Sequence, residues 1–135
     1  MSAFSDYLEE KLLSATLCGK AYSPPTQHFI ALYTSATSDV GDSGNEVVGG
    51  DYARIRVLFA APSKGADGDF FCTNDGDVRS PKPSTQPWGR ITHFAIYDAP
   101  VGGNRPYHGA LREARDIGVN DLFFVLSGDL KITLS

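Results

Sequence analysis

The sequence is poor in the residues that build disulfide frameworks, metal clusters and membrane spans. Among its 135 residues are two cysteines, one methionine, one tryptophan and three histidines. Cys18 and Cys72 are too few for a disulfide-stapled scaffold; one bond between them is compatible with their even number, although two small buried thiols are the commoner arrangement. No apolar run approaches the length of a membrane-spanning helix, and the N-terminus has no basic segment followed by an apolar one. We therefore expect a protein of a soluble compartment, without a secretion signal.

The sequence also lacks an excess of positive charge. Its formal net charge is −4, which gives no general attraction to nucleic acid or to an anionic membrane. We therefore expect neither of these as a partner.

The remaining composition is typical of a folded β-rich domain. Apolar residues make up 41% and charged residues 21%, as in ordinary globular proteins. Fourteen glycines and eight prolines favour many short strands joined by turns. The length predicts a single domain over residues 1–135, divided into a helix with its linker (1–25) and a β-sandwich (26–135).

A hairpin following Trp88 is the strongest pattern in the chain. The run Ile91–Tyr97 is β-branched and aromatic, which is typical of a strand with both faces covered. The Gly-Gly-Asn sequence at 102–104 tolerates the positive φ angles of a turn, and Arg105–Leu111 is expected to return as a second strand. Pro106 has no N–H to donate, so this second strand should begin at an edge or at a strand end.

The N-terminal segment predicts one helix from Met1 to Gly19. Ser5 is suited to cap it, and Gly19 to end it. Four apolar side chains fall on one face at helical spacing: Phe4, Leu8, Leu12 and Ala15. This narrow face has two interpretations, because it either covers the domain's own sheet or docks on a partner.

The rest of the chain predicts seven or eight short strands with regular turn signals. The expected strands cover residues 27–34, 52–59, 91–97, 105–111, 121–126 and 130–134, and further short extended pieces lie at 69–73, 77–79 and 113–117. We therefore predict a mainly β fold, an antiparallel β-sandwich resembling a jelly roll with one N-terminal α-helix. The last strand should hold the C-terminal segment in a sheet.

No catalytic or metal-binding pattern is stronger than its structural alternative. Residues 41–44 repeat the Gly-Asp-Ser-Gly found around the nucleophile of trypsin-like proteases, but the chain is too short for the rest of such a site. His93 and His108 should face each other across the hairpin, without an evident third metal ligand. The turn aspartates lack the spacing of an EF-hand: Asp67, Asp69, Asp75 and Asp77. We therefore predict no catalytic residue, no metal and no cofactor.

Four sequence blocks resemble a family of small tailed-bacteriophage virion proteins often labelled phage tail fibre proteins. They are Phe4–Glu10, Ile30–Ser35 followed by Gly44–Arg54, Trp88–Ala99 followed by Gly102–Asn104 and Gly109–Leu111, and Gly128–Leu134. The Thr-His-Phe-Ala-Ile-Tyr-Asp-Ala and Asn-Glu-Val…Tyr-Ala-Arg sequences within them are the specific ones. The segment 67–87 departs from the family pattern, which suggests that specificity for one host particle resides there. The resemblance implies a virion component that is assembled in the host cytoplasm and is not an enzyme.

Within that class we favour a capsid decoration (cement) protein that stabilises the assembled head. A chain without repeats or heptads cannot form a shaft, so it must lie on a surface, join two components or form a tip. It would bind the major capsid protein as a homo-oligomer, for example a trimer. The alternative is a tail, collar or tail-fibre component that links virion parts or contacts the host receptor. A third hypothesis, from a different class, is an enzyme or a metal-dependent carbohydrate binder using His93, His108 and the turn aspartates.

Ten residues are the expected partner contacts, because the helix, the long loop 35–51 and the proline-rich segment exceed what a minimal sandwich needs. They are Phe4, Tyr7, Leu8, Asn45, Glu46, Phe70, Phe71, Pro81, Pro83 and Trp88.

Overall fold

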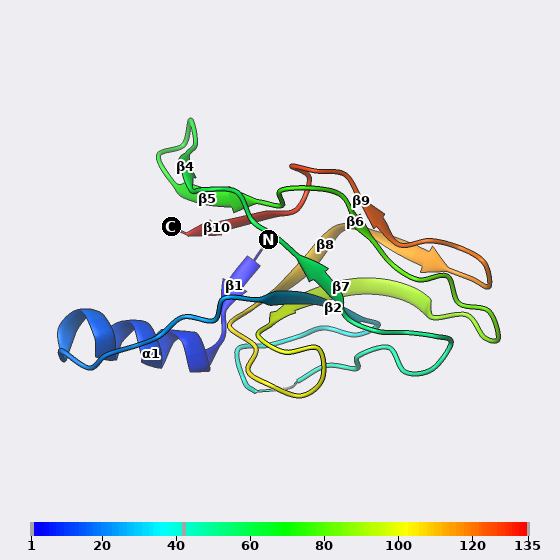
Figure 1. The fold of residues 1–135 in the computed structure, drawn as a ribbon, viewed down its shortest axis with the longest axis horizontal. Helices are drawn as coiled ribbons and strands as arrows, with labels where there is room; N and C mark the ends of the chain where they lie inside the picture. The colour runs from blue at the N-terminus through cyan, green and yellow to red at the C-terminus, as the bar shows by residue number, and fades with distance from the viewer. Residues whose placement is uncertain (1, 42, 135) are drawn as a thin grey trace.

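The computed structural model describes residues 2–41 and 43–134, whose regular structure is one main sheet, two smaller sheets and one helix (Figure 1). The main sheet has the spatial order β1 (Ser2–Phe4), β8 (Tyr107–Ile117), β7 (Gly89–Tyr97), β2 (His28–Tyr33) and β3 (Ile55–Val57). The second sheet has the order β10 (Lys131–Leu134), β5 (Phe70–Thr73) and β4 (Ser63–Lys64). The third pairs β6 (Val78–Arg79) with β9 (Phe124–Val125).

Every strand pair is antiparallel, and α1 (Asp6–Leu17) is the helix of the described residues. This confirms the predicted mainly β, antiparallel fold with one N-terminal helix. The strand order does not confirm a jelly-roll connectivity. No helix among the described residues has the length and apolar character that crossing a membrane requires.

The core lies between the main sheet and the two smaller sheets. Alternate residues of β2 and β7, such as Ile30 and Ile96, point into it and are inaccessible or nearly so. Val78 of β6, Val125 of β9 and Ile132 of β10 cover them from the opposite side. Burial of these side chains on one face of the main sheet is what holds the small sheets in place, because each is too small to be stable alone.

The opposite face of the main sheet is covered by loops. The side chains there form a smaller buried cluster of Ala31, Tyr33, Ala95 and Tyr97. Loops 35–51 and 98–104, cyan and yellow in Figure 1, run below this face. Both faces of β2 and β7 are therefore covered, as the continuous apolar character of their sequences predicts.

A bulge in the β7–β8 pair accompanies the burial of both Ile91 and Phe94 in the core. Residues three apart in a regular strand lie on opposite faces. Ile91 pairs with Arg115 but His93 pairs with Ala110, so residues 111–114 of β8 lie opposite the single residue 92 of β7, and the extra residues belong to β8. The alternation in β7 restarts at His93, which shares the loop-covered face with Ala95 and Tyr97, while Ile91 and Phe94 both stay buried.

The predicted helix from Met1 to Gly19 is too long at its start. Ser2–Phe4 instead pairs with β8, and Ser5 caps the shortened helix by accepting the Leu8 N–H at 3.3 Å. The backbone N–H of Ser5 donates to Pro106 O at 2.9 Å, which fixes the start of the helix to the main sheet. Gly19 follows the helix end with φ +69°, as its predicted role requires.

A further strand prediction differs from the structure. The predicted strands 105–111 and 113–117 form one continuous strand, β8 (Tyr107–Ile117), which pairs with β7 on both sides of the bulge. The strands on either side of the turn at Asn74, for which the sequence predicted no partners, belong to different sheets, since β5 pairs with β4 and β10 while β6 pairs with β9. The predicted strand at the C-terminal end is present as β10.

Candidate contact surface

The three histidines do not form a common site in the described part of the chain. His93 pairs with Ala110, and His108 pairs with Ala95, so the two imidazoles lie diagonally and not face to face. The predicted direct opposition was wrong because residues 98–104 form a longer loop, closed by hydrogen bonds from Asn104 to the Asp98 carboxylate.

One group of three potential metal-ligating side chains occurs among the described residues. Asp6, Glu9 and Asp39 place their carboxylate oxygens within 4.8 Å of one another, and all three are exposed. One Asp39 oxygen is already 2.8 Å from His108 Nε2. The turn aspartates are not gathered into such a group; Asp67 and Asp77 instead accept backbone N–H groups of Asp69 and Ser127.

The protease-like segment has a structural role where it is described. Ser43 Oγ accepts the Ser38 N–H at 2.8 Å and a guanidinium N–H of Arg105 at 2.9 Å. Asp42 lies outside the described residues.

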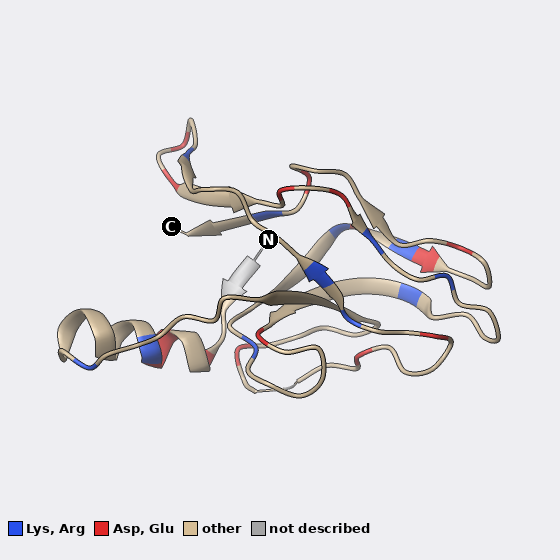
Figure 2. Ribbon diagram, in the orientation of Figure 1, with Lys and Arg blue, Asp and Glu red and all other residues tan. Residues whose placement is uncertain are grey.

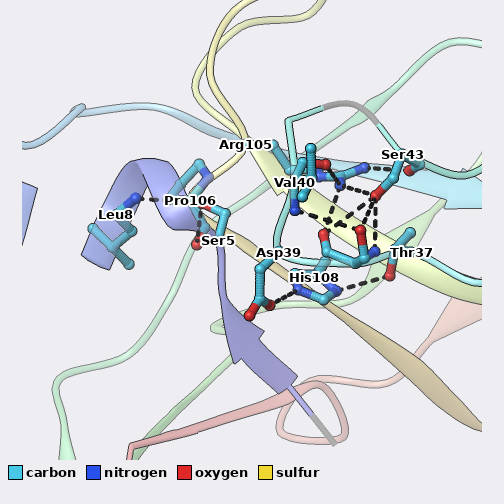
Figure 3. A network of polar contacts seen from close by, with 10 residues as sticks. Ser5, Leu8, Thr37, Asp39, Val40, Ser43, Arg105, Pro106 and His108 are labelled. Carbon is cyan, nitrogen blue, oxygen red and sulfur yellow. Dashed lines mark hydrogen bonds and ion pairs between the residues drawn. The ribbon is translucent and has the colours of Figure 1, made fainter. Parts of the chain in front are cut away.

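Arg105 fixes the first half of loop 35–51 to the main sheet (Figure 3). This residue is 3% exposed, and its guanidinium donates to the carbonyl oxygens of Ser43 (2.7 Å), Ser38 (2.9 Å) and Val40 (3.1 Å). His108 holds the same loop through Thr37 and Asp39, each at 2.8 Å. The Arg105 guanidinium therefore binds backbone carbonyl oxygens of the chain's own loop.

A second polar cluster fixes the other half of the loop. Arg54 makes two hydrogen bonds to the Glu46 carboxylate, at 2.9 and 3.0 Å, and its guanidinium stacks 3.6 Å from the Tyr97 ring centroid. Tyr52 donates to the same carboxylate at 2.6 Å. Burial, followed by the bond to Glu46, raises the pKa of Tyr52 well above its usual range. These groups are positioned to stabilise the loop and leave little of Glu46 free.

An apolar groove of about 320 Å³ opens between the main sheet and the β4–β5–β10 sheet. Its lining is almost entirely apolar and comprises Pro24, Pro25, His28, Phe59, Pro62, Phe70, Phe71, Cys72, Ile96, Tyr107, Ile132 and Leu134. Ile96 and Ile132 also belong to the core, so the groove is the open end of the sandwich. Burial lowers the pKa of His28, which keeps this imidazole neutral at neutral pH.

The helix α1 extends away from the sheets beside this groove (Figure 1). Leu8 is its buried residue, whereas Leu13 is 58% and Leu17 is 78% exposed. On the predicted face Leu8 is buried and Leu12 and Ala15 are half-buried, so the exposed Leu13 and Leu17 form a separate apolar surface beside it.

The structure separates the ten predicted contact residues into three groups. Phe70 and Phe71 line the groove, and Phe4 packs edge-to-face on Tyr107 of its wall at 5.5 Å between ring centroids. Asn45 and Pro81 are exposed, and Tyr7 is half-buried. The others are occupied within the chain: Leu8, Glu46, Pro83 and Trp88.

Trp88 and Pro83 are buried for identifiable reasons. The indole of Trp88 is 5% exposed, packs edge-to-face on Tyr52 and donates its Nε1–H to Gly50 O at 2.8 Å. Pro83 is fully buried, and its carbonyl accepts the Asn120 N–H at 2.8 Å. The predicted contact residues do not include Leu13 and Leu17, although the i, i+4 spacing of these two leucines is visible in the sequence.

Both cysteine thiols are free, Cys18 at the exposed end of α1 and Cys72 in the groove wall. The disulfide between them that the sequence left open is absent.

Comparison with known protein families identifies a match. A family model described as Gp80: Podophage GP4 fiber I protein gp80 matches residues 3–133. No curated protein matches the chain.

Proposed function

The chain belongs to the Podophage GP4 fiber I protein gp80 family, a phage fibre family, and from this membership we propose that it is a non-enzymatic subunit of the tail-fibre apparatus. The observation that carries the proposal is the match over residues 3–133, which covers nearly the whole folded chain and not a single motif.

The family supports the fibre alternative better than the capsid decoration protein that the sequence analysis favoured. The decoration hypothesis followed from the absence of repeats and heptads. The same absence is compatible with a fibre system when the chain is a joint, a branch or a tip, and other subunits form the shaft. We propose such a linking role, in which the protein contacts other tail proteins of the virion.

The distribution of polar and apolar groups supports a binding role over a catalytic one. The buried charged side chains, Arg54 and Arg105, bind backbone carbonyls or a neighbouring carboxylate and so stabilise loops. The exposed apolar side chains of α1 and the groove lie at one end of the molecule. Exposed apolar patches of this kind commonly mark sites of protein association. We refer to α1 and the groove together as the apolar end.

Labelling of the phage that encodes this chain tests the proposal. A small epitope tag inserted in the exposed loop 98–104 should be detected by antibody and electron microscopy on the tail of each particle. Label on the head lattice would overturn the fibre assignment in favour of capsid decoration. Absence of the protein from purified particles would overturn a structural role altogether.

A matched pair of variants tests which end of the molecule attaches it. Replacement of Leu17 (78% exposed) by lysine should reduce incorporation into particles, whereas the same change at Val101 (86% exposed) should not. Equal incorporation of both variants would show that the apolar end is not the attachment surface.

A further inference from the structure

Two complementary apolar surfaces at the same end of the molecule have no partner within the described chain. Ten large apolar side chains are exposed among the described residues, and four of them belong to α1 or line the groove: Leu13, Leu17, Phe70 and Leu134. The other six lie in loops. One surface is convex, a helix, and the other is concave.

The exposed side of α1 is a defined stripe. Glu10, Leu13 and Leu17 follow at i, i+3 and i+7, a spacing that places them on one face of a helix. Beyond Lys11 the helix carries no charge, as Figure 2 shows, so its distal half offers leucines without competing ionic groups.

The helix is held so that its end points away from its own groove. Ser5 is tied to Pro106 O by its N–H (2.9 Å) and its hydroxyl (3.2 Å), and Leu8 is buried beside this anchor. The linker returns along the helix, with the Tyr22 hydroxyl beside that of Tyr7. Twelve residues extend about 18 Å from the anchor. The Leu17 side chain is therefore accessible to another molecule and is not part of the chain's own core.

A positive charge lies next to one residue that lines the groove. Lys64 is directly opposite Phe70 in the β4–β5 pair, so its side chain is on the same face of this sheet as Phe70, which lines the groove. Lys64 is exposed, and none of the ion pairs of the described residues involves it or Glu10. The nearby Asp67 carboxylate is occupied by the Asp69 N–H at 3.1 Å. An acidic residue one turn before two leucines therefore matches a lysine at the rim of an apolar groove.

We infer that the groove receives α1 of a second copy of this chain, with Leu13 and Leu17 as the inserted anchors and Glu10 paired with Lys64. This inference rests on the proposed function, since it names one partner of the apolar end. A volume of about 320 Å³ suits a few side chains and not a whole helix, as in other complexes in which an amphipathic helix lies in a groove. Donor and acceptor surfaces differ, so each copy gives one helix and accepts one, and the assembly closes as a symmetric oligomer.

Sedimentation analysis of the purified full chain over a concentration series into the high micromolar range tests this contact. The wild type should associate, and the double variant Leu13→Lys/Leu17→Lys should remain monomeric. Lysine keeps the helix propensity and favours the C-terminal end of a helix, so folding is preserved. The matched control is Leu126→Lys. Leu126 is exposed to nearly the same extent as Leu13 (56% against 58%), but it lies in a loop and not in α1.

The charge pair gives a second, independent measurement. Glu10→Lys and Lys64→Glu should each weaken association by about five-fold, within the range of exposed ion pairs, and the two together should restore it. Restoration would assign the contact to these two residues, because two unrelated surface defects would add.

Three results would overturn the inference. They are a wild type that stays monomeric throughout the series, association unaffected by the leucine variants, and additive defects in the charge-swapped pair. The virion labelling described above separates the two proposals: a monomer that still enters tails retains the proposed function and assigns the groove to a different tail protein. A protein absent from virions that still associates through α1 removes the proposed function alone.

Discussion

Asn74 is 2% exposed, and its side-chain amide connects two loops. Its Nδ2 donates to the carbonyls of Gly76 (2.8 Å) and Leu126 (3.0 Å), and its Oδ1 accepts the N–H groups of Gly128 (3.0 Å) and Leu130 (2.9 Å). The turn after β5 and the turn before β10 therefore share one buried amide. Nothing in the sequence distinguishes this asparagine from an ordinary turn residue, because its partners other than Gly76 are more than fifty positions away.

Asn74→Ala is expected to lower the free energy of unfolding by about 2–4 kcal/mol, since it leaves several buried backbone groups unpaired. Urea denaturation followed by fluorescence of Trp88 measures this change. Asp75→Ala, at the neighbouring exposed position, is the control and should be nearly neutral. A loss no larger than the control's would show that solvent replaces the amide without cost.

The histidines predict a loss of stability in mild acid. Burial lowers the pKa of His28 from its ordinary 6.5, with a smaller opposing effect from Asp98, and burial followed by repulsion from His108 lowers that of His93. The unfolded chain therefore binds protons more readily than the folded one. The contribution of these two histidines to stability is fully present above about pH 6.5 and decreases as the pH falls below that value.

His28→Phe should reduce this pH dependence and leave stability at neutral pH unchanged or higher. The phenyl ring keeps the edge-to-face contact with Phe59 and removes the buried Nδ1, which has no partner among the described residues. Thermal unfolding at a series of pH values measures the effect, and His93→Gln provides the comparison at the second site. An unchanged pH profile in the phenylalanine variant would contradict the assignment.

At the scale of elements, the sequence predicted the type of each element better than the strands with which it pairs. Continuous apolar and aromatic runs identified β2 and β7, which bury both faces, and alternation identified β10. It could not place Ser2–Phe4 in a strand, since that assignment depends on β8 being present beside it. It also could not show that β5 and β6 pair with different sheets, because backbone pairing across the fold is not encoded in local pattern.

The contact residues show the same limit. Phe70 and Phe71 were predicted and do line the groove. Trp88, which directly follows the proline-rich segment, was also predicted as a contact. Loop 47–52 instead packs on Trp88, and the indole N–H donates to the carbonyl oxygen of a glycine 38 positions earlier in the chain.

Gly50 is a position at which the packing between elements is sensitive to a single methyl group. A Cβ there would lie 2.6 Å from Gln86 O and 3.0 Å from the Trp88 ring, at φ +60°. Gly50→Ala is therefore expected to cost about 2–4 kcal/mol of unfolding free energy. Gly102→Ala has nearly the same φ, +63°, with nothing within 4 Å of the added atom, and should cost only about 1 kcal/mol. Equal losses in the two variants would show that backbone conformation, and not the contact with Trp88, makes Gly50 necessary.

At the scale of the whole molecule, the two faces of the main sheet are covered in different ways. The main sheet is covered by small sheets on one side and by loops tied through Arg54 and Arg105 on the other. The apolar end is not covered by the small sheets or the loops, and its helix α1 extends away from the sheets (Figure 1). A folded domain with one exposed apolar end suits a subunit that joins larger parts, which is the role proposed from the fibre family.

Association through α1 has a thermodynamic consequence that can be measured without the virion. A partner that binds only the folded state stabilises it by mass action, so the melting temperature depends on protein concentration. We expect the melting temperature of the wild type to rise with concentration and that of Leu13→Lys/Leu17→Lys to stay constant. At the lowest concentration the two should coincide, because both leucines are exposed in the monomer and contribute little to its own folding. Differential scanning calorimetry over a dilution series makes the comparison. A melting temperature that is independent of concentration in the wild type, or equally dependent in both proteins, would contradict a contact made by this helix.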